Sequence, residues 1–455
     1  MQCWRASWRK HDVTTSSHVG LTPRRSPRKI LMEDLLSRSA TGKVAWRLLP
    51  FLFLLYLINI LDRVNVSMTR LQMMPDLGMS EGAYAFGAGA FYIGYVVFEV
   101  PSNLILARVG ARRWISRIMI SWGLITCALM AVQEPWHFYV LRILLGFAEA
   151  GFFPGIILYM TYWFPTRLRA RTVAFFMAAS PLTGALGNPL AGAIMNFMND
   201  LAGLQGWQWV FVLEGAPAVV LGVIVLFYLT DRPEQASWLT AAERDWLADH
   251  VGGEEKARRQ VHGMTLFQAM AHPRVWHLIF LYFTVAVASN AFGFYQPKLI
   301  DERIHGLDPF EVGLLAAIPN LCAMAAMIAN GLHSDRTGER RWHVAIPAFV
   351  SAIGWIMCAY LDSPAWFIFS LALMQVGIMS MLPTFWSLPT AFLSGAAAAA
   401  GIALINSVGN LGGVVAPNIL GQFKEITGSF TGGLLTIAAI MTLGGFLALC
   451  VRLRR

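Results

Sequence analysis

The feature of this sequence that most constrains its fold is a series of long, uninterrupted apolar segments. A helix that crosses the roughly 30 Å hydrocarbon core of a bilayer needs about 20 predominantly apolar residues. Twelve segments approach that length, at residues 48–66, 84–106, 114–132, 137–158, 172–195, 211–229, 275–296, 312–332, 343–361, 365–388, 396–420 and 430–451. Membrane β-strands are shorter and alternate in polarity, which disfavours a barrel. The sequence therefore predicts an all-α membrane protein with twelve transmembrane helices.

Composition supports the membrane class and narrows the chemistry. Of the 455 residues, 56% are hydrophobic and 13% are charged, whereas soluble domains carry about 25% charged residues. The five cysteines are scattered, with neither a CxxC pair nor an adjacent histidine, so we expect no disulfide framework, no metal site and no cofactor. Enzyme signatures such as HExxH or a cluster of histidines do not occur either. We therefore predict that the chain is not an enzyme.

The distribution of positive charge predicts how the helices are oriented. Residues 1–47 hold ten lysines and arginines against three acidic residues. Their Ser-, Thr- and Pro-rich composition predicts a disordered tail, for which nucleic-acid binding is the weaker interpretation. Short loops rich in Lys and Arg lie in the cytoplasm. With the tail placed there, the cytoplasmic loops and the C-terminus carry twelve arginines and the opposite loops carry four basic residues. Both termini are therefore predicted to be cytoplasmic.

One long polar insert divides the twelve segments into six plus six. The predicted parts are a disordered basic tail (1–45), a first six-helix bundle (46–230), a cytoplasmic linker (231–274) and a second six-helix bundle (275–455). Within the linker, Trp238, Leu239, Trp246 and Leu247 are spaced among charged residues. This spacing predicts a short amphipathic helix on the membrane surface.

A loop motif occurs once in each half. Arg108-x-Gly110-x-Arg112-Arg113 follows the second segment, and Arg336-x-Gly338-x-Arg340-Arg341 follows the eighth, 228 residues later. Cytoplasmic positive charge alone does not explain the matched spacing. Glycine permits a tight turn, while Asp and Arg cap helix ends and pair across the face. The predicted cytoplasmic gate comprises Arg108, Gly110, Arg112, Asp335, Arg336, Gly338 and Arg340. Two related, pseudo-symmetric halves predict a transporter with its site between them at mid-membrane.

Longer motifs carry a resemblance to a known family. They are Asn59-x-x-Asp62-Arg63-x-Asn65, Phe91-Tyr-Ile-Gly-Tyr-x-x-Phe-Glu99-Val-Pro101-Ser-Asn103, Arg142-x-x-x-Gly146-x-x-Glu149-Ala-Gly-Phe-Phe-Pro154-Gly, Tyr162-Trp163-Phe164-Pro165 with Arg169-Ala-Arg171, and Ala400-Gly401-Ile-Ala-Leu-Ile-Asn406-Ser-Val-Gly409-Asn410-Leu-Gly412-Gly413. Together with the repeat, these motifs resemble the major facilitator superfamily (MFS). In particular, they resemble its anion:cation symporter branch, which contains permeases for tartrate, phthalate, hydroxyphenylacetate and hexonates.

The resemblance implies the MFS fold and proton-coupled import of a small organic carboxylate across the bacterial inner membrane by alternating access. The expected partners are that anion, protons and membrane lipid, with no nucleic acid, and the chain is expected to be monomeric. An anion exchanger or a uniporter without proton coupling is the alternative. The family's Gly and Asp in the first loop are Asn103 and Ala107 here, as is common in this branch. Ser180 stands where galactonate-type members have a Gln, which argues against a polyhydroxy sugar acid.

Charged residues inside the apolar segments are confined to the first half of the chain. The last six segments contain no Asp, Glu, Lys or Arg. Asp62 lies about 21 Å along a helix that begins at Leu48, at about 1.5 Å per residue. An ionisable residue at that depth is a functional-site hypothesis. The alternative is that Asp62 and Arg63 form a pair at a helix end that reaches the headgroups.

Proton coupling is assigned to three of these residues. Arg142 and Glu149 are seven residues apart, or two turns, and therefore share a helix face. An ion pair of Arg142 with Asp62 or with Glu149 is expected, and a static pair that only fixes packing is the alternative. We predict Asp62, Glu149 and Arg142 as the proton-coupling residues. Glu214 and Arg117 lie near predicted helix ends and are interpreted as capping or snorkelling residues.

Substrate binding is assigned mainly to Arg63. A guanidinium holds a carboxylate through two hydrogen bonds and stays charged when desolvated. Tyr95 offers a hydroxyl, although it is equally an interfacial aromatic, and Asn410 alternatively satisfies backbone groups near the glycines. Glu99 is predicted to belong to the cytoplasmic gate rather than to carry a proton. The predicted substrate-binding residues are Arg63, Tyr95, Trp386, Asn406 and Asn410.

Overall fold

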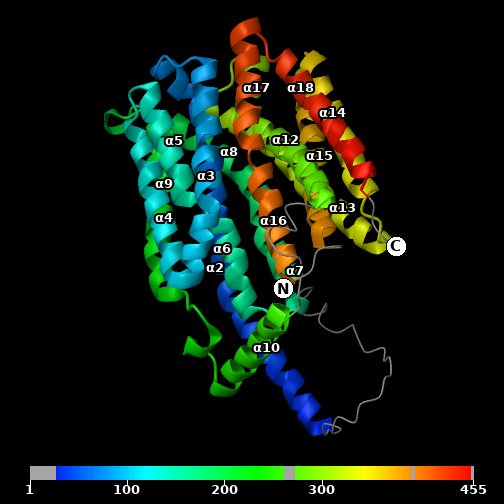
Figure 1. Ribbon diagram of the computed structural model, residues 1–455. Helices are drawn as coiled ribbons and strands as arrows, with labels where there is room; N and C mark the ends of the chain where they lie inside the picture. The colour runs from blue at the N-terminus through cyan, green and yellow to red at the C-terminus, as the bar shows by residue number, and fades with distance from the viewer. Residues whose placement is uncertain (1–26, 261–271, 391–394, 452–455) are drawn as a thin grey trace.

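The computed structural model describes residues 27–260, 272–390 and 395–451, which are almost entirely helical and contain no β-strand (Figure 1). The long helices are α2 (Pro27–Asp76), α3 (Glu81–Val109), α4 (Ala111–Ala128), α5 (Pro135–Glu149), α6 (Phe152–Trp163), α7 (Thr166–Met177), α8 (Ala179–Phe197), α9 (Gly206–Tyr228), α10 (Ala241–Gln260), α12 (Pro273–Arg303), α13 (Pro309–Thr337), α14 (Trp342–Tyr360), α15 (Pro364–Thr390), α16 (Gly395–Gly409), α17 (Gly412–Thr427) and α18 (Thr431–Leu449). The predicted all-α fold is confirmed.

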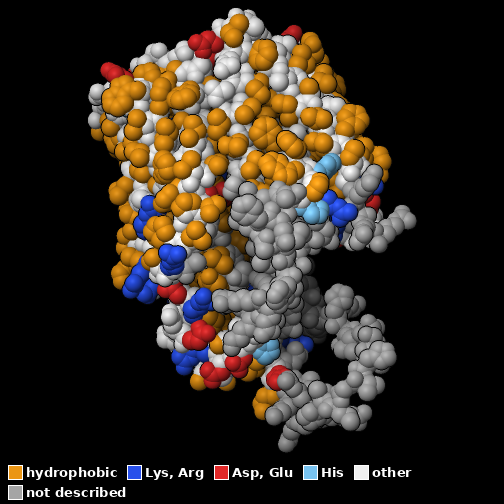
Figure 2. Space-filling view, viewed as in Figure 1, with side chains coloured by type: hydrophobic (Ala, Val, Ile, Leu, Met, Phe, Trp, Pro, Cys, Tyr) orange, Lys and Arg blue, Asp and Glu red, His pale blue; other side chains and the backbone are white. Residues whose placement is uncertain are grey.

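Ten helical stretches in the described part of the chain are long and apolar enough to cross a membrane. The two remaining predicted segments correspond to α7 with α8 and to α16 with α17, in which two shorter helices follow each other directly. Figure 2 shows hydrophobic side chains over most of one face, with Lys and Arg gathered toward the end that carries α10. We call this end the α10 side, and the end with the α2–α3 and α12–α13 connections the distal side.

The helices form two bundles, α2–α9 and α12–α18, with equivalent packing. In the first bundle α3 packs on α5 and α4 on α9, and in the second α13 packs on α15 and α14 on α18. Between the bundles, α8 lies against α13 and α3 lies against α17. Each of these contacts joins the second membrane segment of one half to the fifth membrane segment of the other. The sequence-level repeat therefore corresponds to a structural pseudo-two-fold, and the interface between the bundles is the natural place for a site.

Besides the α7–α8 junction, two more of the membrane segments are broken into two helices. After Glu149, the chain leaves α5 at Ala150 and enters α6 through Gly151, whose φ of +86° strongly favours glycine. A Cβ atom on Gly151 would also collide with the Ser102 hydroxyl. The second break, between α16 and α17, lies at Asn410 and Leu411. Such breaks place polar side chains and helix ends inside the membrane region.

The N-terminal prediction needs a correction. α2 begins at Pro27, so residues 27–45 are helical rather than disordered, while the rest of the predicted tail, 1–26, lies outside the described residues. The reason is packing on α10, where Ser39 donates to Glu243 at 2.6 Å and Lys43 bonds the same carboxylate at 2.8–2.9 Å. Leu239, Trp246 and Leu247 are buried. The apolar face of the linker helix therefore packs on the protein rather than on the membrane surface.

The close approach of α3 and α5 generates a stability prediction. A Cβ on Gly146 would collide with the Phe91 carbonyl, and one on Gly94 with the Ile143 carbonyl. Gly146→Val should therefore lower the free energy of unfolding by about 1–3 kcal/mol through overpacking, measured by thermal unfolding in detergent. The control is Gly331→Ala on α13, where nothing lies within 4 Å of an added Cβ. An unchanged midpoint for Gly146→Val would contradict the close contact.

The docking of α10 on α2 generates a pH prediction. Burial raises the pKa of Glu243, but hydrogen bonds from Lys43, Ser39 and Thr240 outweigh it and bring the pKa to about 2. Because this pKa is depressed below the usual value of about 4.3, the docking contribution is complete above pH 4.3 and is lost as the pH falls toward 2. Spin labels on α2 and α10 should show a narrow distance distribution at pH 7 that broadens only in that acidic range.

For the same labels, Glu243→Gln should broaden the distribution already at pH 7, because the amide keeps no ion pair with Lys43. Asp245→Asn, at an exposed position of the same helix, is the control and should behave as the unmodified chain. Equal distributions for the Glu243 variant and its control would show that α10 is held by its apolar face alone.

Candidate functional site

A pocket lies between the two bundles, and its lining combines two arginines with neutral polar groups. Arg63 and Arg142 are its only charged lining residues among the described part of the chain, and no acidic side chain belongs to the lining. The neutral polar lining residues are Tyr56, Tyr92, Ser180 and Asn188 from the first bundle and Tyr282, Ser289, Asn290, Gln296, Asn320, Gln375 and Asn410 from the second. The pocket is therefore electropositive on one wall and amide-rich on the other.

Arg63 is held at the pocket by a buried acid. Its Nε donates to Glu149 Oε1 at 2.5 Å, and its terminal nitrogen pairs with the same oxygen. Asn59, one turn earlier on α2, donates to that oxygen at 2.8 Å. The Glu149 side chain is 1% exposed and that of Arg63 is 27% exposed, so the arginine keeps access to the pocket while the acid does not. The guanidinium also lies 5.1 Å from the ring centre of Tyr95.

Arg142 lines the same pocket without an acidic partner among the described residues. It is 2% exposed, donates one hydrogen bond of 3.2 Å to the Ala88 carbonyl and lies 4.8 Å from the ring centre of Phe91. Its Nε has no hydrogen-bond partner. The ion pair expected with Asp62 or Glu149 is not formed, because Glu149 is engaged by Arg63. Arg142 therefore has donor capacity to spare for an anion in the pocket.

Asp62 faces away from the pocket, although it is adjacent to Arg63 in sequence. Its carboxylate accepts a hydrogen bond from the indole of Trp122 on α4, inside the first bundle. Adjacent residues of an α-helix project about 100° apart, so Asp62 and Arg63 leave α2 in different directions. The structure thus brings Arg63, Glu149 and Arg142 together around the pocket and separates Asp62 from them.

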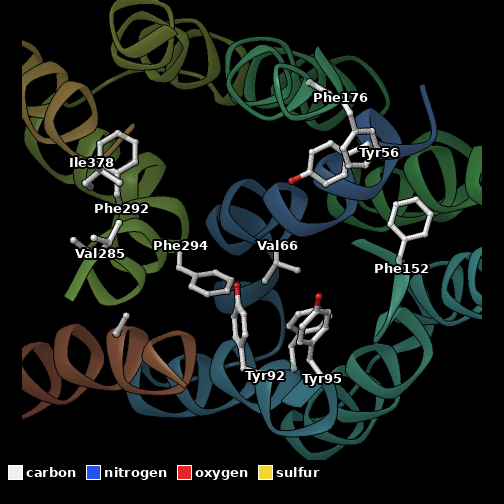
Figure 3. Close-up of a cluster of buried hydrophobic side chains, with 14 of the residues drawn as sticks. Tyr56, Val66, Tyr92, Tyr95, Phe152, Phe176, Val285, Phe292, Phe294 and Ile378 are labelled. Carbon is white, nitrogen blue, oxygen red and sulfur yellow. The ribbon is translucent and has the colours of Figure 1, made fainter. Parts of the chain in front are cut away.

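The other predicted substrate residues are distributed around the pocket. Asn410 lines it, at the break between α16 and α17. Tyr95 is buried and lies beneath the Arg63 guanidinium, and Figure 3 shows it beside Tyr92 on α3. Trp386 does not line the pocket but packs on the lining residue Tyr282, with ring centres 4.9 Å apart. Each of these aromatic residues therefore supports a neighbour that does line the pocket.

Asn406 occupies a different place from the one expected. It donates to Glu99 at 2.9 Å, and Ser407 donates to the other oxygen of the same carboxylate at 2.8 Å. Glu99 belongs to α3 and is 4% exposed, so these bonds join the two bundles. The contact places Asn406 in the interface between the bundles, at Glu99, rather than in the pocket lining.

The repeated loop motifs make contacts within their own halves. Gly110 has a φ of +98°, and the backbone N–H of Arg112 donates to Asp231 at 2.8 Å at the start of the linker. In the second half, Asp335 pairs with Arg340 at 2.7 Å across the turn at Gly338, whose φ is +68°. Arg108 and Arg336 are exposed. The motifs shape the loops of the α10 side, and the described residues include no contact between the two copies.

The distal side of the pocket is closed by tight contacts between the bundles. Arg70 of α2 is buried between Tyr84 of α3 and Tyr295 of α12, at 4.4 and 4.3 Å from their ring centres, and pairs with Glu81. Close by, a Cβ on Gly192 of α8 would collide with the backbone of α13. A cation between two aromatic rings is attracted by both faces. Arg70 therefore clamps α3 of the first bundle to α12 of the second, and this role was not predicted from the sequence.

Three lining amides were also missed from the sequence. Gln375 donates to Asn320 at 2.8 Å, and Asn320 faces Gly184 so closely that an added Cβ would lie 2.6 Å from its amide oxygen. Asn188 lies one turn further on α8. A polar amide inside an apolar segment was the available signal, but the sequence does not fix which side of its helix such a residue faces.

Comparison with known proteins agrees with this architecture. The profile of the Major Facilitator Superfamily matches residues 52–417. A "putative tartrate transporter" of Agrobacterium vitis is 48% identical over 92% of this chain and 92% of its own length. NicT of Pseudomonas putida, a "putative metabolite transport protein", is 41% identical over 91% of this chain and 95% of its own length. RhmT of Escherichia coli, an "inner membrane transport protein", is 37% identical over 93% of this chain and 98% of its own length.

Solved structures share the fold at low sequence identity. A D-xylose–proton symporter superposes with a TM-score of 0.71 at 16% identity, covering 89% of this chain and 97% of that one. A bacterial homologue of the human lysosomal transporter Spinster gives 0.69 at 17% identity, covering 90% and 94%. The chain belongs to the Major Facilitator Superfamily, a superfamily of multi-pass membrane transporters rather than enzymes, and its relatives are those of the anion:cation symporter branch indicated by its motifs.

The ion pair at the pocket generates a thermodynamic prediction. Arg63→Met leaves the buried Glu149 carboxylate without its counter-ion, which should lower the free energy of unfolding by about 3–5 kcal/mol. Glu149→Gln should cost less, because Arg63 retains access to water in the pocket. The double variant should recover much of the loss, and thermal unfolding in detergent measures all three.

The control is Arg303→Met on the distal surface, whose partner Asp362 is 87% exposed. Such a pair is worth less than about 1 kcal/mol. If the double variant loses the sum of the two single losses, Arg63 and Glu149 do not act as a coupled pair.

Proposed function

We propose that this transporter imports a small organic carboxylate across the bacterial inner membrane in symport with protons. The observation that carries the proposal is the charge of the pocket, in which two arginines and no acid line the described wall. Such a pocket attracts anions and repels cations. Both termini and α10 are proposed to lie in the cytoplasm, because the loops on that side carry most of the arginines.

The proposed substrate contacts are divided between the bundles. Arg142, with its vacant Nε, and Arg63, once released from Glu149, each bind a carboxylate through the planar guanidinium. Asn290 and Asn410 from the second bundle offer amides that bind carboxylate or hydroxyl groups. A short dicarboxylate with hydroxyl groups suits two arginines facing amides. The relatives named as putative tartrate transporters support tartrate as the first probe.

The proposed coupling step is protonation of Glu149. The protonated acid no longer holds Arg63, which then becomes free to bind substrate, and the loaded site has less net charge when the bundles rock. Importing an anion into a negative cell costs about 2.3 kcal/mol per charge per 100 mV. Two protons reverse the sign of the transported charge for a monoanion and cancel the charge of a dianion such as tartrate. The buried carboxyl groups of Asp62 and Glu149 are the proposed carriers.

Alternating access is proposed to use different contacts at the two ends. On the distal side, the Arg70 clamp between Tyr84 and Tyr295 must open to admit substrate from outside. On the α10 side, the hydrogen bonds of Glu99 to Asn406 and Ser407 must break to release it. The helices themselves move as packed bodies, with the two bundles turning about the interface formed by α8 with α13 and α3 with α17.

The test is transport by the purified protein in vesicles that contain a pH-sensitive dye. The panel comprises tartrate, aromatic acids, sugar acids and pantothenate, added outside at zero and at negative membrane potential. The proposal predicts that one compound acidifies the interior and accumulates with the proton gradient. Transport or exchange without any pH change would sink proton symport and leave an anion exchanger or uniporter.

The pocket arginine gives a matched prediction. Arg142→Met should weaken binding of the transported carboxylate roughly 10- to 100-fold, because a charge-assisted hydrogen bond is worth about 1.5–3 kcal/mol. Affinity is measured by isothermal calorimetry in detergent, with Arg303→Met as the control. An unchanged dissociation constant for the Arg142 variant would remove this residue from the substrate site.

A further inference from the structure

A second polar cluster lies inside the first bundle, away from the pocket. Asp62 and Asn65 project from one face of α2, Trp122 and Thr126 from one face of α4, and Glu214 from α9. All five side chains are at most 4% exposed, and none of them lines the pocket. Glu214 is the ninth residue of α9, which begins at Gly206, so the earlier interpretation of this residue as a cap at a helix end is wrong.

The members of this cluster are in contact or in electrostatic range. Trp122 donates to Asp62, and the Glu214 carboxylate interacts electrostatically with that of Asp62 and lies beside the Asn65 side chain. The helices are close enough for this, because a Cβ on Gly215 of α9 would lie 3.0 Å from the backbone nitrogen of Cys127 on α4. Three helices therefore bring two acids together in the interior of the bundle.

The hydrogen-bonding capacity of the cluster is largely unused. Neither oxygen of Glu214, neither polar atom of Asn65, one oxygen of Asp62 and the Thr126 hydroxyl have a partner among the described residues. No Lys or Arg pairs with either acid in that part of the chain. The other ionisable groups that face Asp62 are the Cys127 thiol on α4 and, across α2, the Glu149 carboxylate. Two buried carboxylates within electrostatic range of each other, without a cation paired to either, disfavour the state in which both are ionised.

We infer that Asp62 and Glu214 together form a proton-binding carboxyl pair, separate from the substrate pocket, that carries one of the coupling protons. The role of the pair in transport rests on the proposed symport. Whether the pair binds a proton does not, because it can be measured in the purified protein without transport. Proton binding and substrate binding then take place on different faces of α2, at the adjacent residues Asp62 and Arg63.

The surroundings favour a particular arrangement of the proton. The Trp122 indole is a donor only and therefore stabilises Asp62 in its ionised form. Glu214 has beside it only the Asn65 amide, which both donates and accepts, so Glu214 is assigned the proton when the pair holds one. Asn65 and Thr126 both donate and accept, so they can serve the pair in either protonation state. A second proton, taken up by Asp62, neutralises the cluster.

A proton suits the cluster better than a metal cation does. Sodium sites in transporters draw on carbonyls of unwound helices. Here α2, α4 and α9 are continuous at residues 62–65, 122–126 and 214, so their backbone carbonyls are engaged in helical hydrogen bonds. Only side-chain oxygens remain, and both acids among them bind protons.

The first test measures the proton directly, without transport. Infrared difference spectra of the purified protein at neutral pH should contain the carbonyl stretch of a buried protonated carboxylic acid, and Glu214→Gln should remove it. Glu234→Gln, at an exposed position of the linker, should leave the band intact. A wild-type spectrum without the band, or a band that persists in the Glu214 variant, would overturn the carboxyl pair.

The second test measures coupling in vesicles, with tartrate or whichever panel member the wild type transports. Glu214→Gln should retain substrate exchange within about threefold but lose at least tenfold in proton-driven accumulation, with one proton fewer per substrate. Glu214→Asp keeps the carboxyl group and should restore coupling with an altered pH profile. Accumulation by Glu214→Gln equal to that of the control, or accumulation driven by a sodium gradient, would overturn the inference.

The two tests separate this inference from the proposed function. If the wild type moves substrate without any pH change while the infrared band depends on Glu214, proton symport fails and the protonated pair stands as a structural proton site. If the wild type acidifies vesicles and Glu214→Gln does so equally, symport stands and the inference fails.

Discussion

The net charge of the pocket depends on which acid neutralises Arg63. Glu149, at the end of α5, pairs with it, and Asn59 adds a hydrogen bond to the same oxygen, so one buried acid fixes α2 against α5. Because that acid is already engaged, Arg142 on the same helix has no counter-ion among the described residues. A buried guanidinium without a carboxylate is costly, and an anionic ligand is its most direct compensation. The positive surplus of the pocket follows from this one pair.

The two bundles are joined toward the two ends of the molecule by contacts of different kinds. On the distal side, glycines let helices from both bundles touch through their backbones, and Arg70 is enclosed by two aromatic rings. On the α10 side, one carboxylate, Glu99, accepts two hydrogen bonds from the opposite bundle. Backbone contacts are broad and insensitive to protonation, whereas the bonds of a single acid depend on its ionisation. The two ends therefore respond differently to the same change in charge.

Much of the architecture was predictable from the sequence, because hydrophobic length and turn chemistry are local properties. The helices and the two halves follow from them, and Arg63 at the pocket follows from its charge inside an apolar segment. Helix rotation is not local, since packing sets it, and the sequence therefore did not separate Asp62 from its neighbour Arg63. The same limit explains why the ion pair predicted for Arg142 with Asp62 or Glu149 is not formed. Glu214 was placed at a helix end because the apolar run starts at residue 211, whereas α9 begins at Gly206.

The neutral wall of the pocket has an evolutionary consequence. Asn290, Asn320 and Gln375 of the second bundle bear no charge, so replacing one of them leaves no buried ion without its partner. Arg63 and Glu149 of the first bundle lack this freedom, because the loss of either leaves the other as an unpaired charge. Duplicated copies of such a chain can thus diverge at the neutral wall while the charged wall is kept. The two walls of one pocket are therefore under different constraints.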